Sequence, residues 1–326
     1  MNAHPLLSKR SLVAMLATLA AIGPSAKADG YPTRPVKIIV AVPAGNGPDV
    51  IGRIVADQLT RLWGQQVVML NQPGANGATA MRAVGASAPD GYTLFLTTTS
   101  NYIAPPEWKL PIDVVRDFVP IGLVSEQPLL VGVPPALGVN SLQELIEVAK
   151  KHPGEINFGV GTPRGFFPHL TAERLRKATK TDMTIVHYSG AAQAITDLIA
   201  GRVHVMIENL SFFEGPIAGR MLRPLAVTSN RRWPTMPELP TAAEIIPGFV
   251  ATGWFALAAP PGTPPAIARK ISDDLRMVLA RPEIEQRLLE LGGYAHPMTP
   301  EESSSFIRSQ QDLWRPIVSE ITATSK

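Results

Sequence analysis

Apolar strands alternate with helices along most of the chain, and this alternation constrains the fold more than any other feature. Residues 36–42 form a continuous β-branched run, a Gly-rich turn follows at residues 43–49, and apolar residues then recur at helical spacing up to Trp63. Strands at residues 67–70 and 92–97 come next, separated by a helix of small residues. Strands that are apolar on both faces and alternate with helices are typical of a parallel sheet covered on both sides. The first hundred residues therefore predict one α/β unit.

A second unit of the same kind follows an apolar segment at residues 118–133, which proline interrupts. A length of 326 residues also favours two domains over one. Hydrophobic periodicity and helix-capping residues place the remaining elements. We predict strands at residues 156–160, 183–188, 203–207, 225–228 and 254–259, and helices at residues 141–152, 168–178, 190–200, 264–280 and 282–291, with a last helix from residue 299.

The N-terminus has the organisation of a secretory signal peptide. Lys9 and Arg10 precede an uncharged, mostly apolar run at residues 11–22, and small residues suited to cleavage lie at positions 25–28. The alternative is a membrane anchor, but the run is shorter than the roughly 20 apolar residues that cross a bilayer. We expect cleavage after residue 28 and an exported, soluble protein in the periplasm.

Composition excludes several chemistries. The chain contains no Cys, so disulfides, thiol nucleophiles and Cys-ligated metal sites are ruled out. Its net charge of +3 belongs to the signal peptide, because three of the 30 basic residues and none of the 27 acidic residues lie in residues 1–28. Basic residues do not gather with aromatic ones, so we expect no nucleic-acid partner.

Four polar loops follow predicted strands, and their position favours an anion-binding site. They lie at residues 43–49, 97–101, 161–169 and 188–190, and three of them contain glycine. Free N–H groups and the positive end of the helix dipole attract anions at helix N-termini. In open α/β sheets, ligands bind beyond the carboxyl ends of the strands. The alternative is that these loops are ordinary strand-to-helix connections. Four polar loops at strand ends favour the binding site over this alternative.

Catalytic motifs are absent. The chain has no G-x-x-x-x-G-K-[ST], G-x-G-x-x-G, G-x-S-x-G or H-E-x-x-H pattern, and its histidines lack metal-ligand spacing. Asp49 is a candidate general base, although an acid in the first turn of a helix is stabilised by the dipole without any chemistry. His169 is better explained as a hydrogen-bond partner at a helix start than as a base. We expect no enzyme activity, no cofactor and no metal.

Several short motifs together resemble the Bug family of solute receptors, the TctC-like components of tripartite tricarboxylate transporters. Each motif alone is weakly specific, but their order spans essentially the whole mature chain. The motifs are YPTRP at residues 31–35, NQPGANG at 71–77, APDGYTL at 88–94, PHL at 168–170, YSG at 188–190, LAVT at 225–228, LPTAAE at 239–244, PGF at 247–249, and Trp254.

The resemblance implies a type II periplasmic-binding fold, in which two α/β domains joined by crossing strands close over a small carboxylate. The first domain would comprise residues 29–128 and 253–326, and the second residues 129–252. The resemblance also implies membrane transporter components as partners, and we expect a monomer. The ligand-binding residues implied are Ala44, Gly45, Asn46, Gly47 and Asp49, then Thr98, Thr99, Ser100 and Asn101, then Thr162, Phe167 and His169, and finally Tyr188, Ser189, Gly190 and Asn209.

Departures from the family pattern suggest the ligand. Where the family often has a small polar loop before PHL, this chain has Pro163-Arg164-Gly165 followed by Phe166 and Phe167. We interpret Arg164 as a candidate fork for a second carboxylate, with aromatic walls beside it. The alternative is an Arg164 that points to solvent and phenylalanines that pack in the core.

Four functions stay open on the sequence alone. The favoured one is a receptor for a dicarboxylate, with an aromatic diacid of the phthalate or terephthalate kind as first choice. Citrate or an aliphatic C4–C6 diacid is the second choice. A sensory receptor for a periplasmic kinase domain and, least favoured, a hydrolase are the alternatives of other classes.

Overall fold

The computed structural model describes residues 30–323, so the predicted signal peptide lies outside the described residues. The described strands form one mixed sheet with the order β2-β1-β3-β9-β4-β7-β5-β6, and β8 and β10 pair with β4 beside this path. The strands are β1 (Val36–Val40), β2 (Val67–Asn71), β3 (Thr93–Thr98), β4 (Val119–Val133), β5 (Asn157–Val160), β6 (Thr184–His187), β7 (Val205–Asn209), β8 (Arg223–Val227), β9 (Thr252–Ala259) and β10 (Tyr294–Ala295).

Helices cover both faces of this sheet, as the sequence predicted. The α-helices are α2 (Gly47–Trp63), α3 (Ala78–Gly85), α4 (Thr99–Tyr102), α5 (Val114–Asp117), α6 (Leu142–Lys151), α7 (Phe167–Thr179), α8 (Ala191–Ile199), α9 (Glu214–Ala218), α10 (Ala242–Ile245), α11 (Pro265–Leu279), α12 (Pro282–Glu290) and α13 (Pro300–Ala323). Short 3₁₀ turns are η1 (Ala75–Gly77), η2 (Pro106–Trp108), η3 (Pro135–Leu137) and η4 (Leu210–Phe212).

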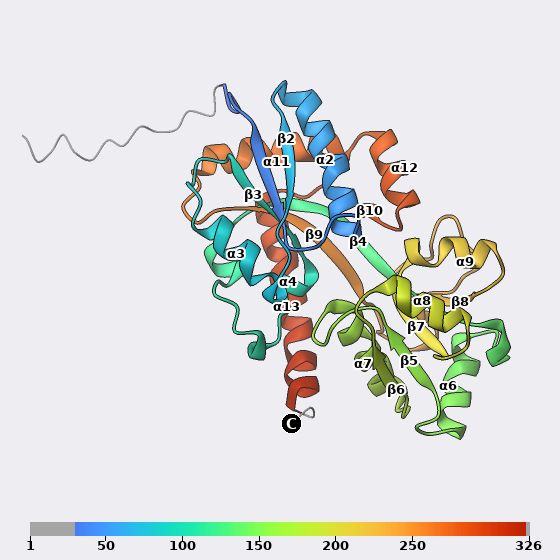
Figure 1. Cartoon of the computed structure of the whole chain (residues 1–326). Coiled ribbons are helices and arrows are strands. Elements are labelled where there is room, and N and C mark those ends of the chain that lie inside the picture. The colour runs from blue at the N-terminus through green and yellow to red at the C-terminus, as the bar shows by residue number, and fades with distance from the viewer. Residues whose placement is uncertain (1–29, 324–326) are drawn as a thin grey trace, which may run out of the picture.

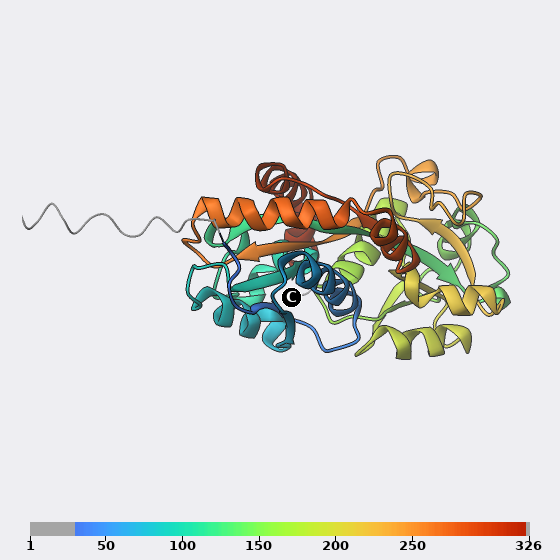
Figure 2. The ribbon, with the colours of Figure 1, turned by 90° about the horizontal axis from the view of Figure 1, so that it is seen from above.

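The elements gather into two lobes that lie side by side (Figures 1 and 2). The first lobe contains β1, β2, β3, α2, α3, α11 and α12, and the second contains β5 to β8 with α6 to α9. In each lobe the neighbouring strands are parallel, because β1 pairs with β2 and β3, and β5 pairs with β6 and β7. The carboxyl ends of the strands in a lobe therefore meet at one edge of its sheet.

Two long strands, β4 and β9, run between the lobes (Figure 1). β4 is one strand of 15 residues, although the sequence predicted a segment interrupted by proline. Its register against β9 shifts beside Pro120 and Leu123, which is how a strand accommodates irregular positions. Residues up to Pro128 pair with β9, and residues from Leu129 onward pair with β7 and β8. The strand thus changes partners at the position where we predicted the domain boundary.

One apolar core continues through both lobes. It includes side chains of α3 and α13 in the first lobe and of α6 and α7 in the second. At the junction, the rings of Phe167 and Trp314 pack edge to face, 5.2 Å apart, and the Arg174 guanidinium lies over Trp314. An ion pair between Lys177 and Glu320 joins the same two helices. The last helix therefore anchors α7, which begins at the site described next.

Candidate functional site

A cavity of about 580 Å³ lies between the two lobes, at the carboxyl ends of their strands. It is bordered by strand ends and by the first residues of helices, which is where α/β folds bind ligands. Its lining includes residues 41–43, 46–48 and 73–77, then 98–101, 161–163 and 166–168, then 189–192, and finally Gln127, Leu129, Glu208, Asn209, Phe212 and residues 253–255. Eleven of the seventeen predicted site residues are among them.

In the first lobe, the start of α2 supplies the first set of backbone donors. Asn46 is the N-cap in an extended conformation, and no side chain of the described residues caps this helix end. Pro48 lies in the first turn, where its missing N–H costs nothing. The N–H groups of Gly47 and Asp49 have no partner within the helix, because the first four donors of a helix never do. Asn46 and Gly47 line the cavity, so this helix start faces it.

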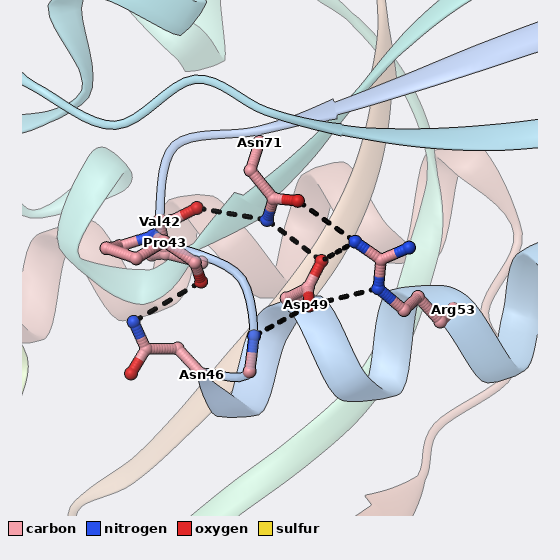
Figure 3. Close-up of polar contacts among 7 residues, drawn as sticks. Val42, Pro43, Asn46, Asp49, Arg53 and Asn71 are labelled. Atoms are coloured by element: carbon pink, nitrogen blue, oxygen red, sulfur yellow. Dashed lines mark hydrogen bonds and ion pairs between the residues drawn. The ribbon is translucent and has the colours of Figure 1, made fainter.

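Asp49 does not line the cavity, but its side chain holds the turn before α2, part of which does. Figure 3 shows its contacts. Its side chain is buried and accepts hydrogen bonds from the Gly45 N–H at 2.9 Å, from Asn71 Nδ2 at 2.8 Å and from Arg53 Nε at 3.0 Å. Burial opposes ionisation, but these donors outweigh it and lower the pKa of Asp49. Asn71 Nδ2 also donates to the Val42 carbonyl. The carboxylate therefore has a positioning role, and Ala44 and Gly45 form the outer part of the turn.

The second predicted loop, residues 98–101, lines the cavity with side chains that already have partners. The Asn101 amide oxygen accepts from the Thr98 N–H at 2.9 Å, which caps the short helix α4. The Thr99 hydroxyl bonds to the backbone of Trp254 on β9. The Ser100 hydroxyl accepts from the Phe167 N–H at 3.1 Å, and this hydrogen bond joins the two lobes. These side chains shape the cavity wall more than they offer free groups to a ligand.

A third loop of the first lobe, which the sequence analysis did not assign to the site, also lines the cavity. Residues 73–77 follow β2, and Ala75, Asn76 and Gly77 all have positive φ angles. Gly77 has a φ of 94°, which favours glycine, and a Cβ there would lie 2.9 Å from Asn101 Nδ2 and displace that amide. The signal for this loop was present, because the Gly- and Asn-rich stretch follows a strand that is parallel to β1.

The second lobe contributes the start of α7, but Arg164 is turned away from the cavity. Thr162 and Phe167 line it, whereas Arg164 is exposed and absent from the lining. The chain turns between these residues because Gly165 has a φ of 85° and packs against the first lobe, where a Cβ would meet Trp108 at 2.9 Å. The Phe166 ring packs at a tilt against the Trp108 ring, with centroids 4.8 Å apart. The proposed fork for a second carboxylate is therefore not at the site in this structure.

His169 and Tyr188 likewise lie behind the cavity wall. His169 is buried, its Nδ1 accepts from the Gly165 N–H at 3.0 Å, and its ring packs at a tilt against that of His187. This is the helix-start hydrogen bond that we considered as the alternative to a catalytic role. The Tyr188 hydroxyl donates to Asp197 Oδ2 at 2.9 Å on α8, away from the lining residues. Both side chains hold the loops in place.

The start of α8 is the third helix end at the cavity. Ser189 and Gly190 line it together with the first two residues of the helix, and no described side chain caps the Gly190 position. Gly161 permits this approach, because a Cβ there would lie 2.5 Å from the Ala191 Cα. Besides the short helix α4, three helices, α2, α7 and α8, thus border one cavity with their N-termini. Their dipoles make its environment favourable for a negative charge.

The end of β7 brings in an ionisable residue that the sequence analysis missed. Glu208 lines the cavity and is 2% exposed; its Oε1 accepts from the backbone N–H of Asn209 at 2.9 Å and from its side-chain nitrogen at 3.2 Å. Glu208 Oε2 and Asn209 Oδ1 have no hydrogen-bond partner among the described residues. Burial raises the pKa of Glu208 to about 7, against the effect of the Asn209 N–H groups. Of this pair, the sequence predicted Asn209 but not Glu208, because a single acid within an apolar strand belongs to no recognisable motif.

Two parallel-strand lobes around a cavity bordered by helix N-termini are the arrangement found in solute-binding proteins of the periplasmic-binding fold. The model of the tripartite tricarboxylate transporter receptor family, TctC, matches residues 51–323. The chain belongs to this family, and the resemblance inferred from its motifs is confirmed.

Individual relatives cover nearly the whole chain. BugT of Bordetella pertussis is 33% identical over 323 residues, which cover 97% of this chain and 98% of BugT. The solved structure of Rpa4515 from R. palustris with adipate has a TM-score of 0.80 and 31% identity, covering 89% of this chain and 97% of that one. MatC from Rhodopseudomonas palustris with bound malate has a TM-score of 0.76 and 26% identity, covering 88% of this chain and 100% of MatC.

Membership in this family settles the class of activity. The family consists of solute-binding receptors and not of enzymes, so the hydrolase alternative is dropped and the expected α/β periplasmic-binding fold is confirmed. Receptors of this family bind small carboxylates and act with the membrane components of a transporter. Within residues 30–323, no helix has the length and apolar character to cross a membrane.

Proposed function

We propose that this protein captures a small organic acid in the periplasm and delivers it to a tripartite tricarboxylate transporter. One carboxylate of the ligand is held at the start of α2, where the Gly47 N–H group and the positive end of the helix dipole border the cavity. The observation that carries this proposal is the uncapped start of α2 at a cavity whose described lining contains no Lys, Arg or His. With no side-chain cation available, backbone donors and helix dipoles are what remain to balance the charge.

The favoured ligand class is a small dicarboxylate. Polar groups of both lobes line the cavity, which suits a molecule with a polar group at each end, and the relatives solved with adipate and malate bind ligands of that kind. The sequence favoured an aromatic diacid such as terephthalate, on the assumption that Arg164 binds its second carboxylate. Because Arg164 is exposed, the aliphatic diacids now precede the aromatic ones in our ranking.

Two further predictions belong to this proposal. The two lobes act as domains, residues 29–128 with 253–326 and residues 129–252, which move about β4 and β9 and close over the ligand. Cleavage after Ala28 releases a periplasmic monomer. A receptor that presents the same ligand to a sensory kinase domain would use the same closed form, so identifying the membrane partner distinguishes transport from sensing.

A thermal-shift screen of the mature protein tests the proposed function. The panel contains adipate, malate, citrate, phthalate and terephthalate, with a neutral sugar and a divalent cation as controls. A ligand at about 100 times its dissociation constant stabilises the folded protein by roughly 2.7 kcal/mol. We expect at least one carboxylate to raise the melting temperature. A shift with the sugar or the cation and with none of the acids would refute the proposal.

A further inference from the structure

The end of the cavity formed by β7 and α8 differs in chemistry from the end formed by α2. Glu208 is the only ionisable side chain among the described lining residues. Its Oε2 atom and the Asn209 Oδ1 atom are both buried acceptors without a partner. Native proteins rarely leave buried acceptors unpaired, so two of them together at a binding cavity need an explanation. A ligand that brings hydrogen-bond donors to this end supplies one.

We propose that Glu208 determines ligand specificity by accepting a hydrogen bond from the second end of the bound acid. This inference rests on the proposed function, because it assumes that the first carboxylate lies at α2. Groups that satisfy Glu208 are a hydroxyl, an amide, or a carboxyl that keeps its proton. Two ionised carboxylates in contact repel each other, and no lysine or arginine of the described lining stands between them. A dicarboxylate therefore binds with one proton shared between its second carboxyl group and Glu208, and a second carboxylate that stays ionised beside an ionised Glu208 is disfavoured.

Charged groups on the neighbouring elements do not offset this effect, because they are engaged elsewhere. Burial and the two Asn209 N–H groups are the causes that shift the pKa of Glu208, and no charged residue contributes. The titratable side chains on the elements that pack against β7 have partners of their own. Glu126 of β4 pairs with His296, and Asp197 of α8 pairs with Arg202. On α7, Glu173 pairs with His169 and Arg176, Lys177 pairs with Glu320, and Arg174 donates to the carbonyls of Gly248 and Val250. Glu208 is thus the group that responds to the ligand here.

The test compares adipate with its monoamide, which has the same length and keeps one carboxylate. Binding of each probe to the mature protein is measured by isothermal titration calorimetry at pH 6 and pH 8. We expect the monoamide to bind at least tenfold tighter than adipate at pH 8. Lowering the pH to 6 should raise the affinity for adipate at least tenfold and change that for the monoamide by less than threefold. Equal affinities for the two probes, unchanged by pH, would overturn the proposal.

Variants separate the role of Glu208 from a general effect of pH. In Glu208→Gln the new amide donates to an ionised carboxylate, so we expect adipate to bind at least tenfold tighter than to the wild type at pH 8. A misfolded protein cannot mimic such a gain. Glu214→Gln, an exposed acid of the same lobe outside the cavity lining, should keep the wild-type pattern. If Glu208→Gln does not fold, the comparison of the two probes on the wild type alone decides.

The outcomes also separate the two proposals. If neither probe binds and no acid of the thermal-shift panel stabilises the protein, the proposed function is wrong. If the acids bind but adipate and its monoamide have equal affinities at both pH values, only the role of Glu208 is wrong.

Discussion

The two ends of the cavity differ in how their buried carboxylates are hydrogen-bonded. At the α2 end, the buried acid Asp49 is fully engaged by Gly45, Asn71 and Arg53, and backbone donors face the cavity. At the β7 end, the buried acid Glu208 keeps one oxygen unpaired beside the cavity. The difference shows that burial of a carboxylate does not define its role. An acid with all its partners supports a loop, whereas an acid with a missing partner is suited to contact a ligand.

The largest expected effect is the pH dependence of stability that Glu208 causes. Its pKa is about 7 in the folded protein and near 4.5 in the unfolded chain, so the folded state binds more protons between these values. Stability therefore falls as the pH rises from 4.5 to 7, by about 3 kcal/mol from this group. Glu208→Gln has no buried charge to form as the pH rises. The free energy of unfolding of the variant, relative to that of the wild type, should therefore increase by about 3 kcal/mol between pH 4.5 and pH 8. Urea unfolding at several pH values measures this; parallel profiles would show that Glu208 titrates normally.

Asp49→Asn should have the opposite sign, because Asp49 is stabilised as a carboxylate. Loss of charged hydrogen bonds to Arg53 and Gly45 should cost on the order of 2 kcal/mol at pH 7, and the cost should shrink as the pH falls below 3.8. The loosened turn should also weaken carboxylate binding about tenfold. Asp57→Asn, an exposed acid on the same helix that pairs with Arg61, is the matched control and should change neither quantity. Equal effects of both variants would contradict a special role for Asp49.

Ser100→Ala tests the hydrogen bond that joins the two lobes beside the cavity. The Phe167 N–H would lose its acceptor, at a cost of about 1 kcal/mol in stability and a few-fold in affinity. Ser305→Ala, on the exposed side of α13, serves as control. Chemical denaturation and calorimetry give the two quantities. An unchanged affinity would mean that the contact between Ser100 and α7 does not matter for the bound state.

Arg164→Ala should have the smallest effect. The side chain is exposed and does not line the cavity, so we expect a change in stability below about 0.5 kcal/mol and in affinity below about twofold. A tenfold loss of affinity for a diacid would show that Arg164 turns inward when the ligand binds, and would restore the fork that the sequence suggested.

How far the sequence predicted the molecule depends on how local each signal is. Patterns of adjacent residues predict strands, helices and the polar loops at strand ends. Such a pattern located the start of α2 with Asn46 and Gly47. The direction of Arg164 depends on Gly165 packing against Trp108, which belongs to the other lobe. The burial of Glu208 depends on the packing of β7 within the second lobe. Neither relation is visible along the chain, because both arise from contacts between distant segments.

A crystal structure of the protein with adipate tests the central claim most directly. We expect one carboxylate within hydrogen-bond distance of the Gly47 backbone N–H group at the start of α2, and the other end of the ligand beside Glu208 and Asn209. A ligand carboxylate bound instead to Arg164, with the α2 N–H groups left without it, would contradict the account.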